Sequence, residues 1–327
     1  MNKLNAVKRK IGILVNKTFA RNLLEKINLV LFHWDERMHT IKKESIDGGK
    51  KYMIIRPFAR TQGLLSTYWY VLKNIRWACE NGYTPYVDFE SDICQYHVDR
   101  EINGTYNAWE YYFEQPFPIS KEEIMNGSQI LLSGWSIRSK FYIKPIPKTL
   151  DAVQSQEIRK LSSRYARINK DVLESANNKY KELFSGKTLG VFLRGTDYVK
   201  LKPKGHARQP EISDVITKID EFIRIYPIDS IFVVTEDYDI FSSLKKRYGE
   251  IVFSSDDYFV RNFDSKDYVE AYFENDAYER GKNYLIRILL LNRCDYLISG
   301  ITNGSLVARC LKIDEYEDAY WFDLGNY

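Results

Sequence analysis

Arg194 and Asp197 directly follow an apolar run, residues 188–193, that is typical of a buried strand. An arginine at the carboxyl end of a strand offers five N–H donors in a rigid fork, which fits a phosphate or a diphosphate. Gly195, which lies between them, allows the backbone to approach a ligand closely or to adopt a positive φ. The same residues also fit an ordinary strand end with a surface salt bridge, so this stretch alone leaves both interpretations open.

Two further predicted strands also end in polar residues. Thr-Glu-Asp at 235–237 follows the apolar run 231–234, and Ser-Gly-Ile-Thr-Asn-Gly-Ser at 299–305 follows the run 296–298. Parallel strands have their carboxyl ends at one edge of the sheet, where ligands bind in open α/β folds. The last segment also begins a helix, whose backbone N–H groups and a hydroxyl would face an anion. Arg194 and this helix start would together hold both phosphates of a nucleoside diphosphate.

Strands and helices alternate along the second half of the chain. This alternation predicts a parallel, Rossmann-like sheet that brings the three polar segments to one edge. The basic loop 200–208 fits two interpretations. It is either a lid that closes over the phosphates or over a lipid-diphosphate acceptor, or it is an ordinary solvated loop. The predicted strands are 188–194, 230–235, 251–253, 295–298 and 319–323, and the predicted helices are 211–225, 238–248, 276–292 and 303–312.

The first half contains a predicted βαβ unit. A strand at 52–57 is followed by a turn with Gly63, a helix that begins at Leu64 and ends at Asn81-Gly82, and a strand at 86–90. The turn lacks the G-x-G-x-x-G pattern of dinucleotide-binding folds. Further along the chain we expect a strand at 129–133, a linker at 145–147 and a polar helical region at 150–183.

The length of 327 residues fits two domains. Apolar residues make up 44% and charged residues 28%, as in soluble globular proteins, and the net charge of +4 does not point to a nucleic acid partner. The 4 cysteines have the spacing of neither a metal site nor a disulfide framework, so we expect reduced thiols in the cytoplasm. We expect a basic N-terminal segment 1–50, an α/β domain 51–147 and a Rossmann-like domain 148–327.

Residues 1–32 combine lysines and arginines with interleaved apolar residues. Such a basic amphipathic segment is typical of a helix that lies on an anionic membrane surface, here the inner face of the cell membrane. A helix packed on its own domain, with its lysines in water, fits the pattern as well. No apolar run reaches the ~20 residues that a membrane-spanning helix needs.

The three polar strand ends resemble, in the same order, three motifs of the fucosyltransferase superfamily, which includes the α1,2-, α1,6- and protein O-fucosyltransferases. Residues 191–198 resemble its H-x-R-x-x-D region, residues 231–237 its apolar strand with a Thr-Asp-type end, and residues 294–305 its D-x-h-I-x-x-x-S-x-x-S run. The turn at Gly63 is similar to the N-terminal glycine turn of these enzymes, and the segment 107–116 is similar to one in bacterial members. The motifs cover roughly the second half of the chain.

The resemblance implies an α/β, GT-B-like fold with two Rossmann-like domains that face a central cleft. It implies an inverting, metal-independent transfer of a sugar, above all fucose from GDP-fucose, without a further cofactor. The acceptor would be a glycan or a lipid-linked oligosaccharide in the synthesis of a bacterial surface polysaccharide. The N-terminal domain would bind the acceptor and the C-terminal domain the nucleotide sugar.

The resemblance also implies roles for single residues. Arg194 would bind the β-phosphate of the donor and offset the charge of the leaving diphosphate, while Glu236 and Asp237 would lie near the nucleoside or the reacting centre. Asp197 would be an active-site or a structural carboxylate. The base for the acceptor hydroxyl is open between Asp197, Glu236 and Asp88. The residues implied at the donor are Arg194, Gly195, Asp237, Thr302, Asn303 and Ser305.

On the acceptor side, tryptophan and tyrosine rings lie next to carboxylates in the segment 107–116. Aromatic faces with nearby carboxylates can hold a sugar ring, but such a segment is equally typical of a packed core. Carboxylates also stand at the end of the predicted strand 86–90. The acceptor-side candidates are Gly63, Asp88, Glu90, Trp109 and Glu110.

The sequence departs from the family pattern at three positions. Phe192 stands where many members have histidine, Arg287 about where an acid is expected, and Gly304 in place of a serine. These departures keep two other classes open. One is a non-catalytic nucleotide- or sugar-binding protein of the same fold, and the other is a Rossmann-type oxidoreductase or methyltransferase. The missing glycine-rich fingerprint counts against an oxidoreductase.

Overall fold

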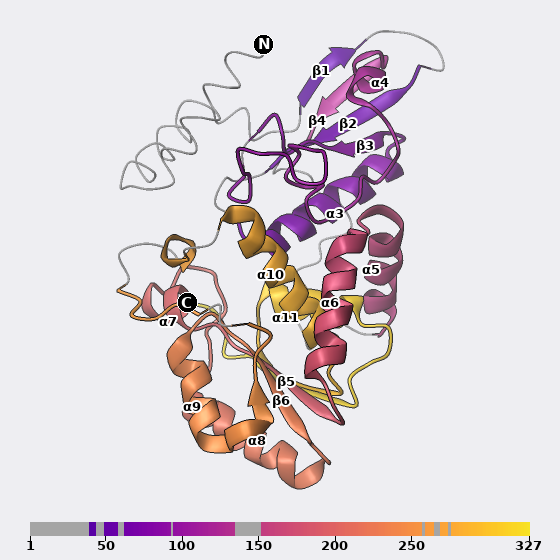
Figure 1. Ribbon diagram of the computed structural model, residues 1–327. Helices are drawn as coiled ribbons and strands as arrows, with labels where there is room; N and C mark the ends of the chain where they lie inside the picture. Colours follow the sequence, from indigo (N-terminus) through magenta and orange to yellow (C-terminus); the bar gives the residue numbers. More distant parts are fainter. Residues whose placement is uncertain are drawn as a thin grey trace. The chain divides into compact units, whose positions relative to one another are not determined.

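The computed structural model divides the chain into two compact units (Figure 1). The first comprises Met1–Lys144 with Arg159–Asn169, and the second Pro145–Ile158 with Lys170–Tyr327. The expectations for the basic segment 1–32 and for a linker at 145–147 lie outside the described residues. The structure describes residues 39–43, 49–57, 62–92, 94–134, 152–256, 259–264, 269–273 and 276–327.

The first unit contains a four-stranded sheet in the order β1-β4-β2-β3. Strand β2 pairs in parallel with both β3 and β4, and β1 pairs antiparallel with β4. Helix α3 connects β2 to β3, so the predicted βαβ unit is confirmed. The elements are β1 (His39–Lys43), β2 (Lys51–Ile55), α3 (Leu64–Glu80), β3 (Thr84–Val87), α4 (Lys121–Met125) and β4 (Gln129–Leu132).

Helix α3 begins and ends where the sequence predicts. Its buried side chains Leu65, Tyr68, Leu72 and Ile75 recur every three or four residues, which places them on one face. After the C-cap the chain leaves the helix at Gly82, whose φ of 74° only glycine adopts without strain. The sequence therefore determines both the length of this helix and the side that it buries.

Strand β3 is shorter than the predicted strand 86–90. It ends at Val87 because the Asp88 carboxylate accepts hydrogen bonds from the backbone N–H groups of Glu90 and Ser91, both at 3.1 Å. An aspartate that bonds to backbone two and three residues ahead forms a turn in place of an extended strand.

The predicted helical region 150–183 is two helices, α5 (Ala152–Tyr165) and α6 (Lys170–Leu183). Between them, the Arg167 carbonyl accepts from the Glu114 N–H at 2.8 Å, and the Asn169 N–H donates to the Tyr112 carbonyl at 2.9 Å. Backbone groups that pair with this distant segment are not available for a helix. The predicted helical region is therefore confirmed as two helices, and a contact over about fifty residues is the reason for the break between them.

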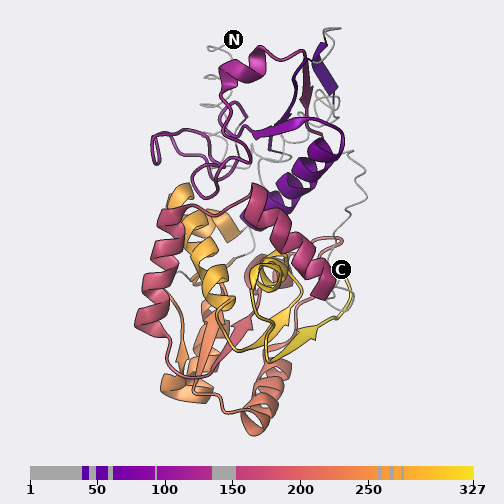
Figure 2. The same ribbon diagram turned by 90° about the vertical axis from the view of Figure 1, so that its right-hand side faces the viewer.

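The second unit contains a five-stranded, fully parallel sheet in the order β7-β6-β5-β8-β9. Helices pack on both faces of this sheet (Figure 2). The strands are β5 (Thr188–Phe192), β6 (Ser230–Val234), β7 (Val252–Phe253), β8 (Tyr296–Gly300) and β9 (Asp318–Phe322). The helices are α6 and, after β5, α7 (Thr196–Lys200), α8 (Ile212–Ile225), α9 (Tyr238–Tyr248), α10 (Ala277–Leu291) and α11 (Asn303–Leu311).

These elements agree with the predicted alternation of strands and helices, apart from α7, a short helix that the sequence analysis missed. Both faces of the central strand β5 are covered, as expected for a parallel sheet. Leu189 and Val191 are fully buried on the side of α8 and α9, where each such side chain contributes about 1.5–3 kcal/mol. Gly190 and Phe192 lie on the other side, towards α10.

All four cysteines are free thiols. In the described part of the chain, no helix combines the length and the apolar character that crossing a membrane requires.

The absence of a side chain at Gly190 allows α10 to pack closely on β5. A Cβ atom there would lie 2.7 Å from Leu291 Cδ1 and 3.0 Å from Cys294 Sγ, closer than van der Waals contact allows. We predict that Gly190→Ala destabilises the second unit by about 1–3 kcal/mol in urea unfolding. Leu291→Ala removes the colliding side chain. The double variant should therefore lose less unfolding free energy than the sum of the losses of the two single variants. Additive effects would contradict the proposed close contact.

Candidate functional site

The strand order of the second unit has one topological switch point. From β5 the chain proceeds through β6 and β7 to one edge of the sheet, and β8 then pairs with the other side of β5. Ligands of open α/β sheets bind outside the carboxyl ends of the strands at this point. Arg194 follows β5, and the turn at Thr302 follows β8. Two of the three polar strand ends predicted from the sequence therefore flank the switch point.

The Arg194 guanidinium is held between two carboxylates. Its Nη2 atom donates to Asp197 Oδ1 at 2.8 Å, and its Nε atom lies 3.1 Å from Glu236 Oε1. The guanidinium also lies over the Tyr198 ring, 4.5 Å from its centroid. The Arg194 side chain is 19% exposed. These contacts fix the orientation of the fork before any ligand binds.

The open donors of Arg194 suit an anion, while Glu236 and Asp197 compensate its charge. Burial by itself lowers the pKa of Arg194, but the carboxylates of Glu236 and Asp197 outweigh it and raise this pKa well above its ordinary value. Within the described residues no group accepts a hydrogen bond from Nη1. Both N–H groups of that atom are therefore open to a ligand.

Glu236 also fixes the loop after β5. Its Oε1 atom accepts from the Gly195 N–H at 2.9 Å and from the Thr196 hydroxyl at 2.8 Å. Its Oε2 atom and Asp197 Oδ2 accept no hydrogen bond from the described residues. Glu236 and Asp197 therefore each use one oxygen for the structure of this loop and keep one oxygen for other chemistry.

Both carboxylate oxygens of Asp237 accept hydrogen bonds from the backbone. Its Oδ1 atom accepts from the N–H groups of Asp239, at 2.9 Å, and Ile240, at 3.4 Å, and so caps α9, while Oδ2 accepts from Thr196 N–H at 3.2 Å. Gly195 has a φ of −105°, so it does not serve a left-handed turn. A Cβ at Gly195 would instead collide with the Asp237 carboxylate. The glycine allows the approach of Asp237 to the backbone.

The turn after β8 is closed by a capping box. Thr302 Oγ1 accepts from the Ser305 N–H at 3.1 Å, and Ser305 Oγ accepts from the Thr302 N–H at 3.1 Å. The Ser305 hydroxyl is fully buried and also donates to the Gly300 carbonyl at 3.0 Å. The two side chains named as phosphate ligands are thus used inside the turn.

The capping box leaves two backbone donors at the start of α11. The N–H groups of Asn303 and Gly304 donate to no acceptor in the described residues. Asn303 is also exposed, so its side chain is accessible. Free N–H groups at a helix N-terminus attract anions, because the helix dipole is positive there.

Arg287 is one of the three departures from the family pattern, and it forms a buried ion pair. Its guanidinium is bidentate to Asp256, through Nη2 to Oδ1 and through Nε to Oδ2 at 3.2 Å. Its Nη1 atom donates to the Thr235 carbonyl at 3.3 Å, next to Glu236. Asp256 thus compensates the charge of Arg287, and the pair holds the ends of β6 and β7 against α10.

The basic loop 200–208 is tied to the last residues of the chain. The Gly205 N–H donates to the Tyr327 carbonyl at 3.2 Å, and the Arg208 N–H donates to the Gly325 carbonyl at 2.9 Å. These bonds connect the loop to the residues after β9, and its role as a lid stays a prediction.

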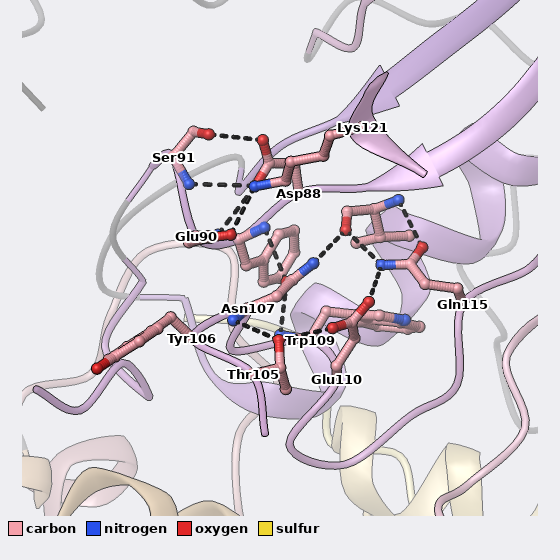
Figure 3. Close-up of polar contacts among 12 residues, drawn as sticks. Asp88, Glu90, Ser91, Thr105, Tyr106, Asn107, Trp109, Glu110, Gln115 and Lys121 are labelled. Carbon is pink, nitrogen blue, oxygen red and sulfur yellow. Dashed lines mark hydrogen bonds and ion pairs between the residues drawn. The ribbon is translucent and has the colours of Figure 1, made fainter. Parts of the chain in front are cut away.

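The first unit has its own polar cluster at the end of β3 (Figure 3). Asp88 Oδ2 accepts from the Ser91 hydroxyl at 2.6 Å, and Lys121 Nζ lies 3.4 Å from Asp88 Oδ1 and 2.6 Å from Glu90 Oε2. Burial lowers the pKa of Lys121, but Asp88 and Glu90 more than offset this and raise it. Both oxygens of Asp88 are engaged, whereas Glu90 is exposed.

Glu110 belongs to a neighbouring network that fixes the loop beside β3 (Figure 3). Its Oε2 atom accepts from the Thr105 hydroxyl at 2.7 Å, and its Oε1 atom accepts from Gln115 Nε2 at 2.8 Å. The Asn107 side chain bridges the Val87 carbonyl and the N–H of Phe89, which joins this loop to the end of the strand. The Glu110 carboxylate therefore has a structural role here.

Trp109 is core. The residue is 2% exposed and its ring stacks on Phe113, with centroids 4.4 Å apart. Tyr111 and Tyr112 of the same segment are fully buried. The structure thus supports the packing interpretation of this segment and leaves the Trp109 ring no open face for a sugar.

Gly63 is the N-cap of α3, with a φ of −60° that other residues also adopt. A Cβ atom there would meet nothing within 4 Å. The Leu64 N–H donates to the Tyr96 hydroxyl at 2.8 Å. The structure thus gives no steric reason for a glycine at this position.

Three residues that lie at the candidate site were not predicted from the sequence. Asp256 had a readable signal, because the polar run Ser254-Ser255-Asp256 follows a predicted strand just as the other three polar ends do. Tyr198 and Tyr284 had none, since tyrosines are frequent in this chain. The described residues contain no cluster of three or more His, Cys, Asp or Glu side chains that could hold a metal.

Comparisons with known proteins identify the fold. No family model and no curated protein matches the sequence. Among solved structures, the fucosyltransferase NodZ from Bradyrhizobium is similar, with 18% identity and a TM-score of 0.50 over 85% of this chain and 96% of that one. FUT1 from Arabidopsis thaliana, in complex with GDP, has 12% identity and a TM-score of 0.50 over 83% of this chain and 70% of that one.

The chain has a fucosyltransferase-like fold. The predicted α/β, GT-B-like fold class is therefore confirmed, with parallel strands in both units. The expected central cleft stays a prediction, as do the roles of the single residues.

We predict that Asp256→Ala destabilises the second unit by about 3 kcal/mol, because it leaves the buried Arg287 charge without its partner. Glu250→Ala is the control, since Glu250 pairs with Lys245 in an exposed ion pair that contributes little. Urea unfolding of both variants makes the comparison. Equal effects of the two substitutions would rule out a structural role for the buried pair.

Proposed function

We propose that this protein is an inverting glycosyltransferase that transfers a sugar from a GDP-sugar, above all fucose from GDP-fucose. The observation that carries the proposal is the Arg194 guanidinium, clamped by Glu236 and Asp197 at the switch point with two N–H groups open. The similar solved structures support the same class, since NodZ is named a fucosyltransferase and the FUT1 structure contains GDP.

The donor diphosphate would bind between Arg194 and the start of α11. Arg194 Nη1 would donate to the β-phosphate, and the N–H groups of Asn303 and Gly304 would donate to phosphate oxygens. Thr302 and Ser305 would act indirectly, because their capping box orients those N–H groups. Gly195 and Asp237 would likewise contribute through the shape of the loop after β5.

The chemical step needs stabilisation of the leaving group and a base. The Arg194 charge would offset the charge that develops on the leaving diphosphate, so no metal ion is required for that task. Asp197 and Glu236 remain candidates for the base that accepts the proton of the acceptor hydroxyl, since each has an oxygen without a hydrogen bond. Asp88 is a weaker candidate, because both of its oxygens are engaged.

The first unit would bind the acceptor, a glycan or a lipid-linked oligosaccharide in the synthesis of a bacterial surface polysaccharide. Glu90 is the candidate most accessible to an acceptor, and Gly63, Asp88 and Glu110 would shape the surrounding loops. The basic amphipathic sequence at 1–32 supports a cytoplasmic location with peripheral contact to the inner face of the membrane.

Nucleotide preference separates this function from its alternatives. Thermal unfolding would be followed with GDP, UDP, CMP, NAD and S-adenosylmethionine, and hydrolysis would be measured for a panel of nucleotide sugars. We expect stabilisation by GDP and slow hydrolysis of GDP-fucose. Stabilisation by NAD or S-adenosylmethionine would replace the proposal with an oxidoreductase or a methyltransferase. GDP binding without turnover of any donor and acceptor would favour a non-catalytic binding protein.

We predict that Arg194→Ala lowers kcat/KM for donor hydrolysis by about 10²–10³, the loss typical of one charge-stabilising group. Arg194→Lys should recover little, because lysine keeps the charge but not the fork. Arg247→Ala, at an exposed arginine of the same unit, is the control and should leave turnover unchanged. Thermal unfolding checks that the variants are folded. Turnover close to wild type in the Ala variant would refute the role of Arg194.

A further inference from the structure

Tyr284 of α10 contacts the first turn of α11 directly beside β5. Its hydroxyl oxygen lies 2.5 Å from the position that a Cβ atom of Gly304 would take, and Phe192 Cζ lies 3.0 Å from the same point. Phe192 is the last residue of β5, two positions before Arg194. The Tyr284 hydroxyl therefore lies next to one of the two open N–H groups of α11, on the side of the strand that leads to Arg194.

The Tyr284 hydroxyl forms no hydrogen bond with any described residue. Three other tyrosines of this unit do: the Tyr226 hydroxyl donates to Asp318 at 2.8 Å, Tyr248 to Asp220 at 2.8 Å and Tyr296 to Glu317 at 2.7 Å. Half-buried tyrosines normally pair their hydroxyl with a polar group. The Tyr284 hydroxyl, beside two free N–H groups, is therefore available to donate to a ligand with several oxygens.

The charge state of Tyr284 makes it a donor. Burial raises the pKa of its hydroxyl above the ordinary value, and this outweighs the opposite effect of the Arg194 charge. The hydroxyl thus keeps its proton at neutral pH. It adds one more donor to Arg194 Nη1 and the N–H groups of Asn303 and Gly304.

We propose that the Tyr284 hydroxyl is a further ligand of the donor diphosphate and donates a hydrogen bond to one of its oxygens. This inference rests on the proposed function, because it takes the GDP part of the donor as the ligand. It also explains Gly304, since any side chain at that position would displace the hydroxyl from the phosphate site.

The test is calorimetric titration of the full chain with GDP and with guanosine. Removing one hydrogen bond to a charged acceptor should weaken GDP binding by about 10-fold or more in Tyr284→Phe. Guanosine binding should stay unchanged, because guanosine lacks the phosphates. Tyr296→Phe is the matched control, since its hydroxyl is at the start of β8, the opposite end of that strand from Thr302, and should leave GDP binding unchanged.

The possible outcomes separate the two proposals. If the wild-type chain does not bind GDP, the proposed function fails and this inference fails with it. If the wild-type chain binds GDP and Tyr284→Phe binds it equally well, only the role of Tyr284 is refuted. An equal loss for GDP and guanosine in Tyr284→Phe would also refute it, because the effect would not depend on the phosphates.

Gly304→Ala gives a second, independent readout. The added methyl group should displace the Tyr284 hydroxyl, so Gly304→Ala alone should weaken GDP binding. In the Tyr284→Phe background the same substitution should weaken GDP binding by a smaller factor, because the colliding oxygen is gone and its hydrogen bond is already lost. An equal weakening of GDP binding by Gly304→Ala in both backgrounds would contradict the proposal.

Discussion

The clamp on Arg194 is the interaction on which the candidate site depends. One guanidinium joins Asp197 on its own loop to Glu236 at the end of the neighbouring strand. The same Glu236 oxygen accepts from Gly195 and Thr196, so the loop after β5 and the end of β6 form one hydrogen-bonded body. The entropy of ordering the arginine is therefore lost during folding rather than on binding, which favours tight binding of an anion.

The topology of the sheet places this clamp at a ligand-binding position. The strand order reverses between β5 and β8, and ligands of open α/β sheets bind outside the carboxyl ends of such strands. Arg194 follows β5, and the start of α11 follows β8. The capping box of Thr302 and Ser305 then satisfies two of the terminal N–H groups and leaves those of Asn303 and Gly304 open. A fixed guanidinium and free backbone donors thus follow two paired strands of the sheet.

The sequence predicted what depends on local patterns. The apolar runs before Arg194, Glu236 and Ser299 are strands of one parallel sheet, and their polar ends include the candidate site. What it missed depends on partners far along the chain. Glu114 and Tyr112 interrupt the helical region at 166–169 by pairing with its backbone.

Side-chain roles were the least predictable part. Thr302 and Ser305 have the right type for phosphate ligands, but their short separation lets them bond to each other instead. Trp109 has the right type for a sugar platform, but its neighbours in the same segment make it core. Tyr284 reaches Gly304 from another helix, which no spacing in the sequence reveals.

The most direct test of this account is a crystal structure of the protein with GDP bound. We predict density for the diphosphate at the switch point, with the β-phosphate within hydrogen-bonding distance of Arg194 Nη1 and of the N–H groups of Asn303 and Gly304. GDP bound at saturating concentration without contact to Arg194 or to the start of α11 would contradict the account.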